Sequence, residues 1–174
     1  MLKIAGIWGG CAGVLYVALS WISLSQRQEL NQYPAWGLLS TALLIIILGT
    51  FIFIAMRQAR AQLYAQTGIN YAQTFYIGVI TSVVTGLIAG TFAFLYIQFI
   101  EPDFTAHLVE ETTKEMTKQK VAPKDIQQNI AEMKEIYTAK VQFMSLLVTT
   151  FFIGIISSSI LSVFVRNRDT FSSN

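Results

Sequence analysis

The sequence predicts an all-α integral membrane protein: a four-helix bundle with an extracytoplasmic amphipathic helical hairpin between the third and fourth spans. Composition gives the first indication, since the 174 residues are 53% hydrophobic and only 13% charged, about half the charged share of a soluble domain. Distribution gives the second. Four long segments contain no Asp, Glu, Lys, Arg or His, namely residues 4–26, 30–56, 62–100 and 141–165.

Each charge-free segment is long enough to cross a bilayer. The hydrocarbon core is about 30 Å thick and a helix rises about 1.5 Å per residue, so a span needs about 20 apolar residues. A charge at mid-membrane costs about 2.5–3.5 kcal/mol, which makes its absence informative. Four buried helices of a soluble protein would leave too little polar surface to cover it. We expect one membrane domain, residues 1–174, with spans at about residues 4–24, 35–56, 75–100 and 141–165.

The first segment could also be a cleaved signal peptide, or an acylated one, because Gly9 and Gly10 precede the single cysteine, Cys11. The apolar run before Cys11 is short for a signal peptide and continues well past it. Trp8 and Trp21 are more typical of a retained span. We therefore expect a membrane helix in which Cys11 is a packed thiol.

The borders of the spans have their own signals. Gly68 is placed to end a helix, and Asn70 followed by Gln73 has the spacing of a capping box that opens the third span. Aromatic side chains that favour the headgroup layer gather near the first two connections: Trp21, Tyr33, Trp36, Tyr64, Tyr71 and Tyr76.

Orientation follows from the positive-inside rule. With both termini inside, the short inner flanks have five cations: Lys3, Arg57, Arg60, Arg166 and Arg168. The outer connections then have seven, which alone favours the opposite orientation. They are, however, much longer and hold nine acids. Charge density therefore favours cytoplasmic termini.

Residues 101–140 are the one region of soluble character. Asp103 is a candidate N-cap of a first helix, and Pro123 suits the first turn of a second. Apolar residues recur at helical spacing in both: Phe104, Leu108, Thr112 and Met116, then Ile126, Ile130, Met133 and Tyr137. These narrow stripes predict two helices that pack on each other, on the bundle or on the headgroups, with a disordered polar loop as the alternative. The second stripe continues into the fourth span without a helix breaker.

Candidate chemistry is sparse. His107, Glu110 and Glu111 share a helical face and could bind a metal, but bundle metal sites draw such motifs from several helices, and a solvated face is favoured. No catalytic triad, phosphate-binding loop or paired-cysteine motif is present. We therefore expect no catalytic, cofactor-binding or metal residues, no cofactor and no enzymatic activity. The net charge of +2, without a basic stripe, also argues against nucleic acid.

The strongest pattern within the spans concerns helix packing. Small residues recur every four positions in the third and fourth spans: Gly78, Ser82, Gly86 and Gly90, then Thr150, Gly154, Ser158 and Ser162. Such ridges let backbones approach closely, a main source of helix association in lipid. The first span has two alternative pairs, Gly6 with Gly10 and Gly9 with Gly13. The aliphatic second span is expected to face lipid, so spans one, three and four would make the inner contacts. A ridge could instead face another protomer.

Two stretches resemble a known family. They are Gly-Ile-Asn-Tyr-Ala-Gln-Thr-Phe, which starts at Gly68, and Tyr-Ile-Gln-Phe-Ile-Glu-Pro-Asp-Phe, which starts at Tyr96. With the span pattern, they are similar to the uncharacterised bacterial four-span membrane family called domain of unknown function 4199. The resemblance implies a bacterial inner-membrane protein and supplies no activity, cofactor or catalytic residue.

The expected function is that of a non-enzymatic membrane scaffold or interaction protein. Its partners would be membrane lipid and either a second copy or another membrane protein. The alternative is a subunit of a transporter or channel for a neutral or hydrophobic solute. Such a pathway would be lined by hydroxyls and backbone, because the spans contain no ionisable residue for ion coupling.

Overall fold

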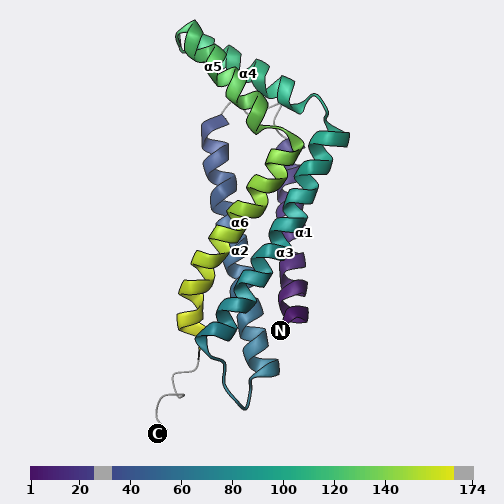
Figure 1. Ribbon diagram of the computed structural model, residues 1–174, viewed down its shortest axis with the longest axis vertical. Coiled ribbons are helices and arrows are strands. Elements are labelled where there is room, and N and C mark those ends of the chain that lie inside the picture. Colours follow the sequence, from purple (N-terminus) through teal and green to yellow (C-terminus); the bar gives the residue numbers. More distant parts are fainter. Residues whose placement is uncertain (26–32, 167–174) are drawn as a thin grey trace. The chain divides into compact units, whose positions relative to one another are not determined.

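The computed structural model describes the backbone of residues 1–25 and 33–166, and the side chains of residues 1–22 and 41–166. Every regular element in these ranges is helical, which confirms the all-α prediction (Figure 1). In chain order the elements are α1 (Leu2–Ser25), α2 (Tyr33–Leu63), α3 (Tyr71–Leu95), the π-helix η2 (Tyr96–Ile100), α4 (Phe104–Lys118), α5 (Pro123–Ile136) and α6 (Ala139–Val165).

Four of these helices are long and apolar enough to span a membrane, and the chain is a multi-pass membrane protein. By length and composition, the candidate membrane-crossing stretches among the described residues are Leu2–Ile22, Thr41–Leu63, Tyr71–Ile100 and Ala139–Val165. The helices extend beyond the predicted spans in two places: α2 continues past Met56, and α3 begins four residues before Phe75. A charge ends an apolar stretch but not a helix, since backbone hydrogen bonds continue into the headgroup layer.

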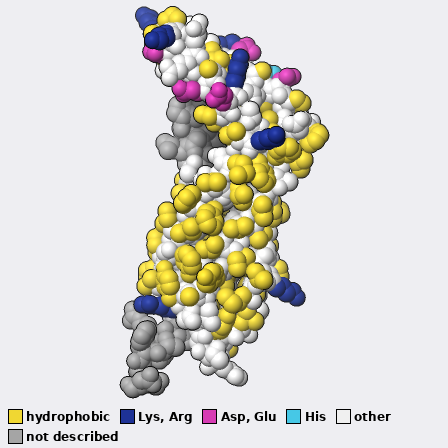
Figure 2. All heavy atoms as spheres, in the orientation of Figure 1, with side chains coloured by type: hydrophobic (Ala, Val, Ile, Leu, Met, Phe, Trp, Pro, Cys, Tyr) yellow, Lys and Arg dark blue, Asp and Glu magenta, His cyan; other side chains and the backbone are white. Residues whose placement is uncertain are grey.

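The chain divides into two compact units, and unit 1 comprises residues 1–89 and 147–174. Within it α1, α2, α3 and α6 run alongside one another (Figure 1). Hydrophobic side chains dominate the visible face of these helices (Figure 2). Many of them are exposed, as expected of a surface that meets lipid rather than water.

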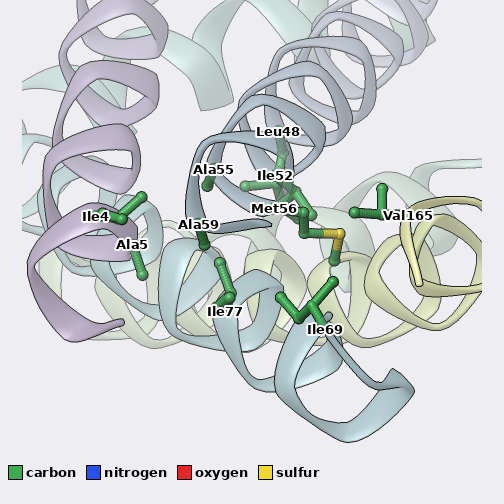
Figure 3. Close-up of a cluster of buried hydrophobic side chains, with 10 residues drawn as sticks. All are labelled: Ile4, Ala5, Leu48, Ile52, Ala55, Met56, Ala59, Ile69, Ile77 and Val165. Atoms are coloured by element: carbon green, nitrogen blue, oxygen red, sulfur yellow. The ribbon is translucent and has the colours of Figure 1, made fainter. Parts of the chain in front are cut away.

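The core of unit 1 lies at the end that contains Met1, the end of α2 and the end of α6. Figure 3 shows ten buried side chains there, drawn from every helix of the unit and from the α2–α3 connection: Ile4, Ala5, Leu48, Ile52, Ala55, Met56, Ala59, Ile69, Ile77 and Val165.

The core corrects the prediction that the second span faces lipid. Half of the cluster comes from α2, and α1 packs along α2. Leu43, Ile45 and Ile46 are exposed as expected, but Leu44 and Leu48 are buried. A helix made of aliphatic residues has the same chemistry on every face. Its sequence therefore does not indicate which face packs against the other helices.

The turn between α2 and α3 is built as its residues predict. Gly68 has a φ of 72°, a conformation that glycine adopts readily, and its amide donates to the Tyr64 carbonyl at 2.9 Å in the turn that follows α2. Asn70 and Gln73 bond reciprocally, each backbone amide donating to the other's side-chain oxygen at 3.0 and 2.9 Å. The capping-box prediction is confirmed. The C-cap prediction was wrong in its position, because α2 ends at Leu63 and Gly68 closes the turn that follows it. The predicted first connection lies largely outside the described residues, as do the side chains of Tyr33 and Trp36.

Unit 2, residues 90–146, contains the end of α3, η2, α4, α5 and the start of α6. Helices α4 and α5 pack against each other. Phe104 and Leu108 are buried, and the remaining members of both predicted apolar stripes are half-buried. Pro123 lies in the first turn of α5 as predicted. Asp103 occupies the N-cap position of α4, but its side chain makes no capping hydrogen bond.

One expectation for this region was wrong. The apolar line of α5 was expected to continue into the fourth span, but α5 ends at Ile136 and α6 begins at Ala139. Tyr137 leaves the helical conformation, with φ −89° and ψ 29°. The Thr138 hydroxyl then accepts from the Val141 amide at 3.4 Å and so caps the new helix. A threonine cap ends one helix and starts another without any Pro or Gly.

Candidate functional site

The small residues of α3 and α6 meet in an antiparallel seam within unit 1. Gly86 lies against the Thr150 hydroxyl, Gly154 against the Ser82 side chain, and Gly78 against the Ser158 hydroxyl. Each four-residue step along α3 matches a four-residue step back along α6. A methyl group added at any of these glycines would overlap the facing side chain, so the backbones lie as close as their atoms allow.

The other two residues of the predicted ridges have different surroundings. Gly90 belongs to unit 2 and lies against Phe143, where an added methyl group would be 3.0 Å from both the ring and the backbone oxygen. Ser162 is fully buried in unit 1. At the positions of Gly78, Gly86 and Gly154 the ridges of α3 and α6 therefore face each other.

The first helix uses one of its two glycine pairs. A methyl group at Gly9 would lie 2.6 Å from the Thr81 carbonyl oxygen and 2.8 Å from Val84, and one at Gly13 would lie 2.8 Å from Ile88. Gly6 and Gly10 have nothing within 4 Å of the same position. Helix α1 therefore packs on α3 through Gly9 and Gly13. Cys11 is exposed, so the expectation of a packed thiol was wrong.

Hydroxyl groups in the seam bond mainly to their own helix. Thr81 donates to Ile77, Ser82 to Val79 and Thr150 to Leu147, at 2.7–3.0 Å. Thr85 also reaches the Gly9 carbonyl of α1 at 3.1 Å. The buried hydroxyls of Ser158 and Ser162 have no hydrogen-bond partner among the described residues. The seam thus offers packing and two spare hydroxyls, but no acid or base.

The base of the α4–α5 hairpin is the second organised region. The Tyr96 hydroxyl donates to the Glu101 carboxylate at 2.6 Å, and His107 Nδ1 lies 3.2 Å from its other oxygen. The Phe104 ring packs edge-on against Tyr96 and tilted against Tyr137. The π-helix η2 closes with the Glu101 amide donating to Tyr96 at 2.8 Å. Such wide turns are frequent where a helix changes direction or has a functional role.

Sequence reasoning did not single out this group. Its signal was present, since Tyr96, Glu101 and Phe104 all lie in the second family-like stretch. Tyr96 opens the π-helix and Glu101 directly follows it, five residues later, with a non-helical backbone. Helical periodicity of 3.6 residues does not predict that contact.

The candidate metal ligands do not converge. His107 is paired with Glu101, and Glu110 with Lys114 at 2.6 Å. In the described part of the chain, no group of three or more His, Cys, Asp or Glu side chains is arranged to bind a metal ion. The Lys114 ammonium, which donates a hydrogen bond to Glu110, lowers the pKa of that carboxyl, and the carboxylate raises the pKa of Lys114. The pair is fully exposed, which is typical of a solvated helix face.

Comparison with known proteins now adds the family. The family model described as "Protein of unknown function (DUF4199)" matches residues 6–167, nearly the whole chain. The chain belongs to this family. No curated protein and no solved structure matches it significantly. Membership in DUF4199 agrees with the resemblance of the two stretches around Gly68 and Tyr96, and both are well-organised parts of the structure: the α2–α3 turn and the hairpin base.

Proposed function

We propose that this DUF4199 protein is a non-enzymatic membrane scaffold or interaction protein that presents the α4–α5 hairpin to a partner. One observation supports this above the others. The hairpin is an ordered helical insertion between α3 and α6, the two spans joined by the close seam of Gly78, Gly86 and Gly154. An ordered, charged helical surface suits recognition, because little conformational entropy is lost when it binds a partner.

The chemistry of the hairpin surface fits a protein partner better than a reaction. Its outward side chains are mixed charges such as Lys118, Lys124 and Glu132, all exposed. Its one histidine is 64% exposed and paired to a carboxylate. We propose no cofactor, no metal and no nucleic acid as partners. The proposed partners are lipid and either a second copy of the chain or another membrane protein.

We place the protein in the bacterial cytoplasmic membrane with both termini cytoplasmic and the hairpin outside. Charge distribution supports this orientation. Unit 1 has Lys3, Arg57, Arg60 and Arg166 among its described residues and no described carboxylate. Arg60 donates to the Val165 carbonyl and Tyr64 to the Met1 sulfur, so these cations gather at one end of the unit. Reporter fusions after Val165 and at Gln119 test this orientation, with opposite signals expected.

The function is tested by photocrosslinking in intact cells. A photoreactive residue replaces Lys118 or Gln128, both exposed on the hairpin, and Ile156, which is 60% exposed on α6, is the matched control. The expected result is one discrete protein adduct from the hairpin positions, with lipid adducts from Ile156. An adduct of twice the chain mass would identify a second copy. If the control reacts with lipid while the hairpin positions give no protein adduct, the scaffold proposal fails.

A transporter or channel subunit for a neutral or hydrophobic solute is the second candidate. The buried, unpaired hydroxyls of Ser158 and Ser162 favour it, because hydroxyls can line a neutral pathway. Solute flux in reconstituted vesicles separates the two functions. Flux that falls in Ser162→Ala, which removes a hydroxyl without adding volume, and vanishes in Gly86→Leu or Ser158→Leu would favour transport. A folded protein without flux would favour the scaffold.

A further inference from the structure

Unit 1 has a cavity of about 560 Å³ between the last turns of α2 and α6. This volume is within the range of about 300–1,000 Å³ that is typical of small-molecule sites. Its walls include Phe53, Arg57, Arg60, Tyr64 and Phe164. Both arginines and Phe164 are exposed, so the cavity opens to the surroundings of the helix ends. In a membrane protein those surroundings are the headgroup layer and the adjoining acyl chains.

The cavity is strongly positive. Arg57 and Arg60 contribute two full charges, and unit 1 contains no Asp or Glu among its described residues to offset them. The C-terminal ends of α2 and α6 oppose these charges with about half a negative charge each. Arg60 donates to the last carbonyl of α6, that of Val165, at 3.0 Å and so satisfies one of those groups. The balance still favours an anion.

The two guanidinium groups retain donors for a ligand. Arg60 uses one of its terminal nitrogens for Val165, and a guanidinium has five N–H donors. Arg57 stacks near the Phe53 ring, 5.8 Å from its centre, and has no hydrogen bond or ion pair with a described residue. An arginine held by an aromatic ring is positioned while its donors remain free. Planar N–H forks match the oxygens of carboxylate and phosphate groups, and every phospholipid headgroup supplies a phosphate.

The walls of the cavity are divided by polarity. Phe53 and Phe164 are apolar, and Phe164 is 74% exposed, on the same helix end as the buried Val165. A ligand that fits must therefore join a compact anion to hydrocarbon. Basic pockets between membrane helices on the positively charged side commonly accept such headgroups. A free inorganic anion would leave the exposed Phe164 ring uncovered.

We propose that this cavity binds an anionic phospholipid, with its headgroup phosphate between Arg57 and Arg60 and its chains along Phe53 and Phe164. This binding is a property of unit 1 and does not depend on the hairpin. The bland explanation is that long cationic side chains at helix ends simply extend into any headgroup layer. Arg166 provides the matched control, because it is exposed, directly follows Val165 at the end of α6 and does not line the cavity.

The test is lipid binding to the detergent-purified full chain, measured by native mass spectrometry. The ligands are phosphatidylglycerol and phosphatidylcholine with identical acyl chains. We expect phosphatidylglycerol to bind tighter by about tenfold, and Arg57→Gln or Arg60→Gln to weaken it about fivefold each, since one basic residue near a membrane surface contributes about 1 kcal/mol. Arg166→Gln should change affinity by less than about twofold.

A second variant tests the cavity without changing the net charge or the hydrogen bond from Arg60 to Val165. Ala65 lines the cavity and is exposed, so Ala65→Trp should fill it without disturbing the core. It should weaken phosphatidylglycerol binding while leaving the net charge unchanged. Equal losses in Arg166→Gln and Arg57→Gln, no headgroup preference, or no effect of Ala65→Trp would overturn the proposal. Displacement of the lipid by millimolar inorganic phosphate would instead assign the cavity to a soluble anion.

Discussion

Gly154 of α6 lies so close to Ser82 of α3 that a methyl group on the glycine would occupy the space of the serine side chain. The two residues are 72 positions apart in the sequence, and each belongs to a ridge that the sequence alone reveals. Together with the contacts of Gly78 with Ser158 and of Gly86 with Thr150, their contact shows that the ridges pair in opposite directions. In lipid this kind of fit replaces the hydrophobic effect as the source of helix association.

Gly154→Ala should therefore destabilise the folded protein by about 1–3 kcal/mol, the usual cost of overpacking a closely packed contact. Thermal unfolding in detergent micelles measures this change. Gly49→Ala is the control, because nothing lies within 4 Å of its added methyl group. That variant should be neutral or slightly stabilised, since alanine has the higher helix propensity.

The double variant Ser82→Gly with Gly154→Ser exchanges the two sides of the same contact. It conserves volume in the seam, so its stability should return toward that of the unmodified chain. If the exchange is as damaging as Gly154→Ala alone, the two residues do not share the space that the structure assigns to them.

Two adjacent glycines of α1, Gly9 and Gly10, allow a similar comparison between a packed and an open position. Gly9→Ala should lower stability by about 1–3 kcal/mol because its methyl group meets the Thr81 carbonyl and Val84. It should also disturb the hydrogen bond from Thr85 to the Gly9 carbonyl. Gly10→Ala, one residue away and facing open space, should be tolerated. Equal unfolding temperatures for the two variants would contradict the packing of α1 on α3.

The capping box should contribute measurably to the start of α3. Asn70→Ala removes an acceptor from the Gln73 amide and should cost about 1 kcal/mol, the usual value for an N-cap. Gln73→Ala removes the reciprocal bond. Because both changes break one motif, the double variant should lose less than the sum of the singles in thermal unfolding. Full additivity would indicate two independent bonds.

The hairpin base should respond to changes locally. Phe104 is 7% exposed and contacts the rings of Tyr96 and Tyr137, so Phe104→Ala should destabilise unit 2 by about 3–5 kcal/mol. Amide hydrogen exchange should accelerate in α4 and α5, with protection in α2 unchanged. Tyr96→Phe keeps the ring and removes the hydroxyl that donates to Glu101, so its effect should be smaller. Faster exchange throughout the chain would argue against a locally stabilised hairpin.

The exposed pair Glu110–Lys114 should titrate as coupled groups. Lys114 lowers the pKa of Glu110 below its ordinary value of 4.5, so the folded state binds fewer protons there than the unfolded state. The small stabilisation of α4 is therefore present above the unfolded pKa and lost as pH falls through the folded one. The raised pKa of Lys114 acts oppositely: its contribution is present below the ordinary value of 10.5 and lost as pH rises through the folded pKa.

A carboxyl-carbon NMR titration of Glu110 measures this coupling directly. Lys114→Gln should raise the pKa of Glu110 toward 4.5, whereas Lys118→Gln, which removes the same charge one turn away, should leave it nearly unchanged. A pKa that moves equally in both variants would mean that general charge, rather than the hydrogen bond, sets it.

Several features could be predicted because they depend on local chemistry. Gly68, Asn70 and Gln73 specify the α2–α3 turn through contacts within a few residues of one another. Pro123 marks the first turn of α5 for the same reason. The end of α5 at Tyr137 was missed, because a threonine hydroxyl is a weaker and more common signal than a proline.

The same distinction between local and long-range contacts applies to the candidate sites. The small ridges were visible in sequence, but which glycine pair of α1 packs was not, because Gly6, Gly9, Gly10 and Gly13 are equivalent until a neighbour is present. The Arg57–Arg60 cavity was also not predictable, since its other wall comes from Phe164, more than 100 residues later.

By itself the sequence determined that this chain crosses a membrane four times as helices, because unpaired backbone groups and charges are too costly in hydrocarbon. It also determined where small residues permit close approach and where a turn must form. Tertiary structure alone decided which faces meet: the pairing of Ser82 with Gly154, the buried side of α2 and the cavity at its end. These depend on which surfaces lie opposite one another, and in a uniformly apolar span no residue type records that choice.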